Sequence, residues 1–353
     1  MDPLTHFMTG GCMARAGFNR MSALATVTMV LAAEAPDIDV VTDFGGDVFA
    51  FSHHRGMTHT LVGVPVVAGL VVFVVWAGWR LRRKFRPKPT TAGTTAEVSA
   101  ANPRWGVLYG LACVAALSHI LLDFTNSYGV RPFMPFNDRW FSWDIVFIIE
   151  PVMWAILAAG LVLPALFRLV DREIGVRDRR PRGRLAAWAA LAAIIGFWAI
   201  RDYEHRRAIA AMDSLTYRGE DALRFSAYPY MSNPFRWYGV IETPNFFERV
   251  DVDSRRPQVD PEDRAEIRPK PAQTPAVIAA KNSYLGRVYL NWAQYPVTEE
   301  EKLQPPQSGY VVRFYDLRYM YPGEGRTFLS GRVRLDDNYN VVSESFGNRS
   351  TQD

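Results

Sequence analysis

Cysteine is scarce in this sequence of 353 residues, which contains only Cys12 and Cys113. Both lie in apolar stretches, where an unpaired cysteine packs as a small apolar residue. So small a number excludes a scaffold held together by several disulfides. Histidine is unevenly distributed as well, because only His205 of the six follows residue 200. A histidine-based metal cluster is therefore not expected in the second part of the chain.

Charge is sparse in the first part of the chain. Residues 1–200 contain 33 charged residues, whereas the shorter stretch 201–353 contains 43. The mean hydropathy of −0.06 therefore averages two unlike parts. Apolar runs cover residues 61–79, 105–122, 145–167 and 185–200, with a shorter run at 21–33. Since about 20 apolar residues cross a bilayer, the pattern predicts an α-helical polytopic membrane domain over residues 1–200. About four to six membrane helices are expected, the first two forming a hairpin.

Basic residues predict how this domain is oriented. Seven Lys or Arg residues lie in residues 80–104 and seven more in residues 168–184, but only three lie in the loops on the opposite side. Because positive residues gather on the cytoplasmic side, both segments are expected in the cytoplasm and residues 201–353 outside it. Topology and anionic lipid then explain the basic runs, and no nucleic-acid partner is expected. Residues 87–103 are expected to form a disordered cytoplasmic linker.

The second part of the chain predicts a β-rich extracytoplasmic domain over residues 201–353. Runs of β-branched and aromatic residues alternate with turn residues, which is typical of short antiparallel strands. The expected strands cover residues 235–243, 246–252, 284–292, 310–321 and 326–335. One antiparallel sheet or sandwich of five to six strands is the resulting prediction.

Ionisable residues converge on the extracytoplasmic ends of the predicted helices. His119 and Asp123 are four residues apart and share one helix face, and Asp37 and Asp39 follow Pro36. The candidate metal ligands are His6, Asp37, Asp39, His54, His59, His119, Asp123 and Asp144. A mixed His/Asp set suits Zn²⁺, with Mn²⁺ as an alternative, and it has room for one or more ions.

Catalytic roles are expected for Asp37, Arg55 and Glu150. Arg55 could stabilise developing negative charge as a rigid donor fork, and one acid among Asp37, Asp39 and Glu150 could act as general base. Each group also has a structural interpretation. The aspartates could stop a helix, and His53, His54 and His59 could belong to a polar loop at the membrane interface. Glu150 could belong to a helix kink beside its neighbouring proline, and His119 could be a satisfied histidine of the helix bundle.

Several motifs occur together in a specific order. They are Thr5-His6, Pro36-Asp37-Ile38-Asp39, His54-Arg55-Gly56-Met57-Thr58-His59, His119 to Asp123, Tyr128-Gly129 and Asp144. In these residues the chain resembles the membrane-bound metal-dependent hydrolases, a bacterial inner-membrane family with a domain of unknown function. The resemblance covers about residues 1–170 and implies a divalent-metal hydrolase in the inner membrane. That family is remotely similar to zinc phospholipase C and P1 nuclease, which implies phosphoester chemistry.

The leading functional hypothesis is therefore a membrane-embedded divalent-metal hydrolase with its site at the extracytoplasmic membrane surface. Membrane lipid is the expected partner, and a phospholipid or lipid-linked phosphoester is the expected substrate. The alternative is a non-catalytic, metal-stabilised membrane scaffold whose β-rich domain binds an envelope partner. A transporter is a weaker hypothesis, because its ion and substrate sites would lie at mid-depth in the membrane. The oligomeric state is left open.

Overall fold

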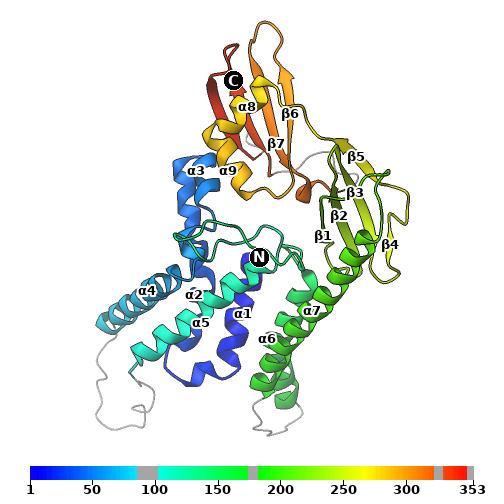
Figure 1. Cartoon of the computed structure of the whole chain (residues 1–353). Helices are drawn as coiled ribbons and strands as arrows, with labels where there is room; N and C mark the ends of the chain where they lie inside the picture. The colour runs from blue at the N-terminus through cyan, green and yellow to red at the C-terminus, as the bar shows by residue number, and fades with distance from the viewer. Residues whose placement is uncertain (86–101, 174–181, 322–328, 348–353) are drawn as a thin grey trace, which may run out of the picture. The chain divides into compact units, whose positions relative to one another are not determined.

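The computed structural model describes residues 1–85, 102–173, 182–321 and 329–347 (Figure 1). Two compact units result, and each is described by itself. The first comprises residues 1–38, 55–143 and 148–199, and the second comprises residues 39–54, 144–147 and 200–353. From sequence, both short segments of the second unit were assigned to the membrane domain. The predicted linker at 87–103 lies, except for its last two residues, outside the described part of the chain.

The first unit is helical. Its elements are α1 (Pro3–Arg15), η1 (Phe18–Arg20), α2 (Ala25–Glu34), η3 (Met57–His59), α4 (Gly63–Phe85), α5 (Trp105–Phe124), α6 (Pro151–Glu173) and α7 (Arg182–Asp213), whose last part belongs to the second unit. The 3₁₀ segment η2 (Ala35–Gly45) also runs from one unit into the other. Helices α1 and α2 form the expected hairpin, and the turn between them uses Gly17 at φ 140°, a value that favours glycine.

Three helices of the described residues are long and apolar enough to cross a membrane, namely α4, α5 and the Gly183–Asp213 part of α7. The predicted number of four to six is thus higher than the structure supports. Part of the difference lies in the hairpin helices α1 and α2, which have only 13 and 10 residues. The rest lies in the run 145–167, whose first six residues are not helical. Pro151 lacks an N–H and stands at the first position of α6, where this costs no hydrogen bond. The apolar part of α6 is consequently limited to Pro151–Phe167.

Small side chains form most of the core of the first unit. The buried cluster between α1, α2, α4 and α5 contains Ala14, Ala25, Ala32, Ala33, Ala68, Ala112 and Ala115, with Met13, Met29, Val71, Val75, Leu108 and Leu111. Small residues let helix backbones approach closely, which is how helices associate in a bilayer that offers no hydrophobic gain between them. The packing is therefore that of a membrane helix bundle.

The closest approach of this kind joins α6 and α7. A Cβ added at Gly160 would lie 2.6 Å from the Cβ of Ala190 and 3.3 Å from the carbonyl oxygen of Ala186. We expect Gly160→Ala to destabilise the protein by about 1–3 kcal/mol, because the two helices must separate. The thermal unfolding midpoint in detergent measures this effect.

Gly196→Ala in α7 is the matched control. A Cβ added there meets no atom of the described residues within 4 Å, and alanine is favoured over glycine within a helix by roughly 0.5–1 kcal/mol. Gly196→Ala should leave the midpoint unchanged or raise it. Equal midpoints for the two variants would contradict close packing at Gly160.

The second unit contains two antiparallel sheets. One has the order β1-β2-β3-β4, with β5 also paired to β3, and the other has the order β6-β7-β8-β9. The strands are β1 (Arg224–Pro229), β2 (Arg236–Glu242), β3 (Phe246–Asp253), β4 (Gln258–Val259), β5 (Glu266–Pro269), β6 (Pro296–Lys302), β7 (Tyr310–Asp316), β8 (Gly331–Leu335) and β9 (Val341–Phe346). The helices α3 (Asp47–His53), α8 (Pro275–Asn282) and α9 (Tyr284–Trp292) and the 3₁₀ turn η5 (Leu317–Tyr319) complete it.

A β-rich domain is thus confirmed, but its details differ from the prediction. The described residues form nine strands in two antiparallel sheets, which is more than the five to six strands predicted for a sheet or sandwich. The expected strand at 284–292 is helix α9. The hydroxyl of Ser283 accepts from the amide of Gly286 and caps this helix, and Leu285, Tyr289 and Trp292 are buried at helical spacing. Its aromatic residues suggested a strand, but the cap and the spacing specify a helix.

A buried ion pair lies at the end of β7. The side chains of Asp316 and Arg318 are both almost fully buried, with Arg318 Nε 2.8 Å from Asp316 Oδ2. Arg318 also donates to the carbonyl oxygen of Trp292 at 3.0 Å and lies 4.6 Å from the ring centroid of that tryptophan. Asp316 further accepts from the amide of Gln294. The pair therefore ties β7, η5 and the end of α9 together.

Candidate metal centre

Four side chains of the first unit place ligand atoms at one point. One ligand atom from each of Asp37, His59, His119 and Asp123 lies within 4.8 Å of all the others. The Nε2 atoms of His59 and His119 each lie 3.4 Å from Asp37 Oδ1 and 3.4 Å from Asp123 Oδ2. The two Nε2 atoms are 3.1 Å apart.

Local structure brings these four residues together. His119 and Asp123 lie one turn apart near the end of α5, on one helix face. Asp37 follows Pro36 just after α2 ends. His59 ends the 3₁₀ turn η3, which leads directly into α4.

Hydrogen bonds of Thr60 connect the turn η3 to the start of α4. The hydroxyl of Thr60 donates to the carbonyl oxygen of Met57 at 2.9 Å and accepts from the amide of Gly63 at 2.8 Å. Thr60 therefore caps the start of this helix. A Cβ at Gly63 would lie only 2.0 Å from the Met57 oxygen, so this turn requires glycine.

The hydrogen bonds of the histidines prepare them for a metal ion. His119 Nδ1 lies 2.7 Å from the carbonyl oxygen of Ala33, which can only accept, so this nitrogen carries the proton. In a neutral imidazole Nε2 then presents its lone pair to the cluster. His59 Nδ1 lies 3.1 Å from the hydroxyl of Thr58. A carbonyl or hydroxyl behind a histidine is the usual arrangement at metal sites.

The donor set fits a divalent cation. Ligands at about 2.0–2.1 Å from a tetrahedral Zn²⁺ lie about 3.3–3.4 Å from one another, close to the distances found here. Two carboxylates and two imidazole lone pairs at such short range repel one another unless a cation lies between them. His59, His119 and Asp123 are almost fully buried, whereas the Asp37 side chain is 32% exposed. Asp37 is therefore the side from which a small molecule can approach.

Arg55 holds Asp123 in place. Its Nη2 donates to Asp123 Oδ1 at 2.8 Å, and its Nη1 donates to the carbonyl oxygen of Gly129 at 2.9 Å. Asn126 Oδ1 accepts from the same Nη1 at 3.3 Å, and the α-amino group of Met1 also donates to Asp123. These bonds hold the guanidinium of Arg55 against the carboxylate of Asp123, which is a candidate ligand. We therefore interpret Arg55 as a positioning residue rather than a substrate contact.

His6 lies beside the four-residue group without belonging to it. Its ring is buried in α1 and stacks on the ring of His119, with 3.7 Å between centroids. Its Nε2 lies 3.5 Å from Asp123 Oδ1. Among the described residues neither ring nitrogen of His6 makes a hydrogen bond. His6 can therefore complete a larger coordination sphere or support His119 by stacking.

The remaining predicted ligands lie in the second unit. Asp39 and His54 pair with each other, with His54 Nδ1 3.4 Å from Asp39 Oδ2. Asp144 belongs to this unit as well. The pKa of Tyr228 is raised mainly by burial, and the nearby Tyr295 and the charge of Asp144 raise it further. None of the three is in the group of converging ligand atoms.

Glu150 has a structural role that the sequence had left open. It belongs to the first unit and is fully buried, and its Oε1 accepts from the amide of Val152 at 3.3 Å. It therefore satisfies a free amide in the first turn of α6. This contact gives Glu150 a role at the start of α6, and its catalytic role stays a prediction.

Sequence reasoning missed Glu34, the last residue of α2. Burial, Asp37 and Asp2 together raise the pKa of its carboxyl to about 7. Burial would also raise the pKa of Asp37, but His119 and His59 reverse this and hold that pKa well below its usual range. Asp37 is therefore an ionised candidate ligand. Glu34 could have been noticed as the only acid in the apolar stretch before Asp37, since such acids mark functional sites.

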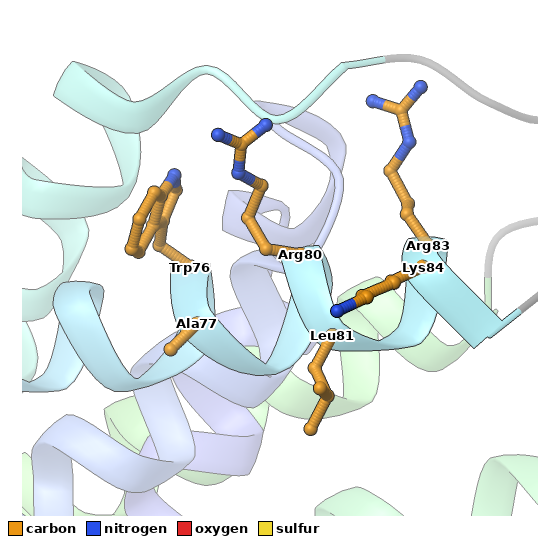
Figure 2. A pocket seen from close by; sticks show the side chains of 6 residues that line it. All are labelled: Trp76, Ala77, Arg80, Leu81, Arg83 and Lys84. Atoms are coloured by element: carbon orange, nitrogen blue, oxygen red, sulfur yellow. The ribbon is translucent and has the colours of Figure 1, made fainter.

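The other end of α4 carries a different surface. A hollow of about 580 Å³ is lined there by Trp76, Ala77, Arg80, Leu81, Arg83 and Lys84 (Figure 2). Arg80 lies 5.5 Å from the ring centroid of Trp76, on the same side of the helix (Figure 2). Aromatic and basic side chains together are typical of a helix end at a membrane interface. None of these residues is a candidate ligand.

Comparison with known proteins identifies the family of the first part of the chain. No curated protein and no solved structure matches the chain. Residues 1–206 match the family model described as YdjM inner membrane protein. This description gives a location and no catalytic activity, so the hydrolase resemblance stays a prediction. Since the match covers more than half of the sequence, the chain belongs to the YdjM inner membrane protein family.

Proposed function

We propose that this protein is a multi-pass inner-membrane hydrolase that uses a divalent metal ion, Zn²⁺ or Mn²⁺, to cleave a phospholipid or lipid-linked phosphoester. The observation that carries the proposal is the convergence of two histidines and two aspartates in an inner-membrane protein. His59, His119 and Asp123 supply the buried side of the site, and Asp37 supplies the accessible side.

The proposed orientation rests on the two ends of α4. The cluster residue His59 lies just before its start, whereas Arg82, Arg83 and Lys84 lie in its last turn. The positive-inside tendency then places the cluster on the extracytoplasmic side. Helices α5 and α7 both run outward in this topology, so the proposal requires α6 as a fourth crossing, although its apolar part is shorter than those of the three candidate spans. Residues 201–353 are extracytoplasmic as a consequence.

Each residue of the site has a defined task in this proposal. When bound, a divalent cation polarises a phosphoryl oxygen and makes water a stronger nucleophile at neutral pH. Asp37, His59, His119 and Asp123 hold the ion, and Arg55 keeps Asp123 fixed and compensates its charge. The Ala33 carbonyl keeps the proton of His119 on Nδ1 and so leaves Nε2 for the ion. The buried side of the cluster excludes water, so approach is confined to Asp37.

The activity is tested with the full chain in bilayer nanodiscs. We expect release of phosphate or a phosphorylated head group from phospholipid to stop after chelation and to return when Zn²⁺ or Mn²⁺ is added. Asp37→Asn should lower the rate more than tenfold, whereas His53→Ala should retain it, because His53 is exposed and outside the cluster. An unchanged rate after verified metal removal would refute the proposal.

A structural metal ion is the second candidate. Its support is that four protein ligands can fill a tetrahedral sphere completely, which is typical of structural zinc. In that case chelation should lower the thermal unfolding midpoint strongly, and no phosphoester should be cleaved with the ion bound. The metal-loaded protein would then serve as a scaffold for an envelope partner of residues 201–353.

A further inference from the structure

Large apolar side chains are exposed beside the candidate metal centre. Met57, Leu61, Val62, Phe133 and Phe136, here called the apolar rim, all belong to the first unit. Phe136 is 86% exposed and Phe133 is 47% exposed. Several large apolar side chains exposed in two segments that are joined to each other favour an interaction site.

The loop that carries Phe133 and Phe136 is bonded to the residues just before α4, a candidate membrane span. The amide of Leu61 donates to the carbonyl oxygen of Pro132 at 2.9 Å, which ties the loop carrying both phenylalanines to the start of α4. Helix α4 begins at Gly63, only two residues later. The loop is therefore fixed at the level where the chain enters the span.

The apolar surface continues along α4. Val66 is 71% exposed and Phe73 is 60% exposed on this helix, and in an inner-membrane protein such positions face lipid. The loop also carries interfacial chemistry, because Arg131 lies 4.5 Å from the ring centroid of Trp140. Tryptophan is typical of the membrane–water interface, where its amphipathic ring lies at the level of the head groups. The continuity with α4 and these neighbours favour a bilayer as the occupant of the rim.

The same segments also build the metal centre. In the short turn η3, Met57 is exposed on the rim, whereas His59 is buried in the cluster. The loop after α5 supplies Asn126 and the Gly129 carbonyl, which hold Arg55 against Asp123. Any surface that the rim enters therefore lies close to the candidate ligands.

We propose that the apolar rim inserts into the outer leaflet of the bilayer and brings the candidate metal centre to the level of the lipid head groups. The ligand class that this arrangement presents to the ion is an anionic lipid head group that approaches from the membrane. The inference deepens the proposed function by naming the route of the substrate. Insertion itself requires no catalysis, so it can be tested separately.

The test uses a fluorescent probe in the full chain. Phe136→Cys, in a background with Cys12→Ala and Cys113→Ala, is labelled with an environment-sensitive dye and reconstituted into vesicles of phosphatidylethanolamine and phosphatidylglycerol. Lipids with a quencher near the head group should quench this dye at least half as strongly as a deep acyl-chain quencher quenches a dye at Phe73→Cys, which lies near the middle of α4. A label at Phe133→Cys should behave in the same way.

The control is Asn338→Cys, in the exposed polar turn between β8 and β9, where no quenching is expected. The proposal is overturned if both rim labels are quenched no more than this control, whether water or another copy of the chain surrounds them. Metal content is measured for every labelled variant to establish that the site is intact. Insertion without hydrolysis would count against the proposed function alone, and hydrolysis without insertion would count against the rim alone.

Discussion

Replacing His119 with alanine should abolish metal binding by the purified protein. The substitution removes one of four converging ligand atoms from a fully buried position, and it leaves two carboxylates with one imidazole. Loss of a group that merely supports a ligand already costs roughly 10–100-fold in metal affinity, so loss of a ligand should cost more. Metal analysis of protein purified in detergent, after dialysis against a weak chelator, measures the effect.

His53→Ala is the matched control for this experiment. His53 is exposed, and its Nδ1 contacts the Ser52 hydroxyl and the Phe49 carbonyl oxygen in α3, away from any candidate ligand. It should bind as much metal as the natural protein. A His119→Ala protein with full metal content would show that the ion lies elsewhere or that no specific site exists.

Replacing Asp316 with alanine should strongly destabilise the second unit. Arg318 would keep a fully buried charge without its carboxylate partner, and the amide of Gln294 would lose its acceptor. Breaking a buried ion pair from one side costs about 3–5 kcal/mol. Hydrogen exchange of the full chain should show faster exchange of β7 amides, by a factor of roughly 10²–10³ or more.

An exposed pair in the same sheet provides the comparison. Arg313 and Glu301 lie 2.8 Å apart, but both side chains are more than a third exposed. Glu301→Ala should therefore cost less than about 1 kcal/mol. If Asp316→Ala prevents expression, Asp316→Asn keeps a hydrogen-bond acceptor and gives a measurable intermediate loss. Equal protection of β7 in the Asp316 and Glu301 variants would contradict the structural role assigned to the buried pair.

The membrane helices show what periodic patterns can and cannot predict. Long apolar runs identified α4, α5 and α7, because crossing a bilayer imposes a minimum length on a helix. The run at 145–167 passed the same test, yet Pro151 and the buried Glu150 start the helix six residues late. Hydropathy records how apolar a segment is. It does not record the local features, here a proline and a capping side chain, that accompany the start of a helix.

The candidate centre divides in a similar way. His119 and Asp123 could be paired from sequence, since four residues along a helix fix their mutual position. The choice of Asp37 over Asp39, and of His59 over His54, could not be made. These residues lie in 3₁₀ turns and loops, where neighbouring side chains point in different directions and tertiary contacts decide. Glu34 was overlooked because its interest comes from its neighbours, Asp37 and Asp2, and not from its own motif.

The contact between Arg55 and Asp123 also bears on biosynthesis. Arg55 precedes Asp123 by 68 residues, so it is synthesised first. An aspartate at the centre of a membrane helix adds roughly 2.5–3.5 kcal/mol to the cost of insertion, and the cost is smaller near the end of a helix, where Asp123 lies. When α5 leaves the ribosome, a guanidinium that can neutralise its carboxylate already exists. Because of this chain order, Arg55 is available to pair with Asp123 when α5 is inserted into the membrane.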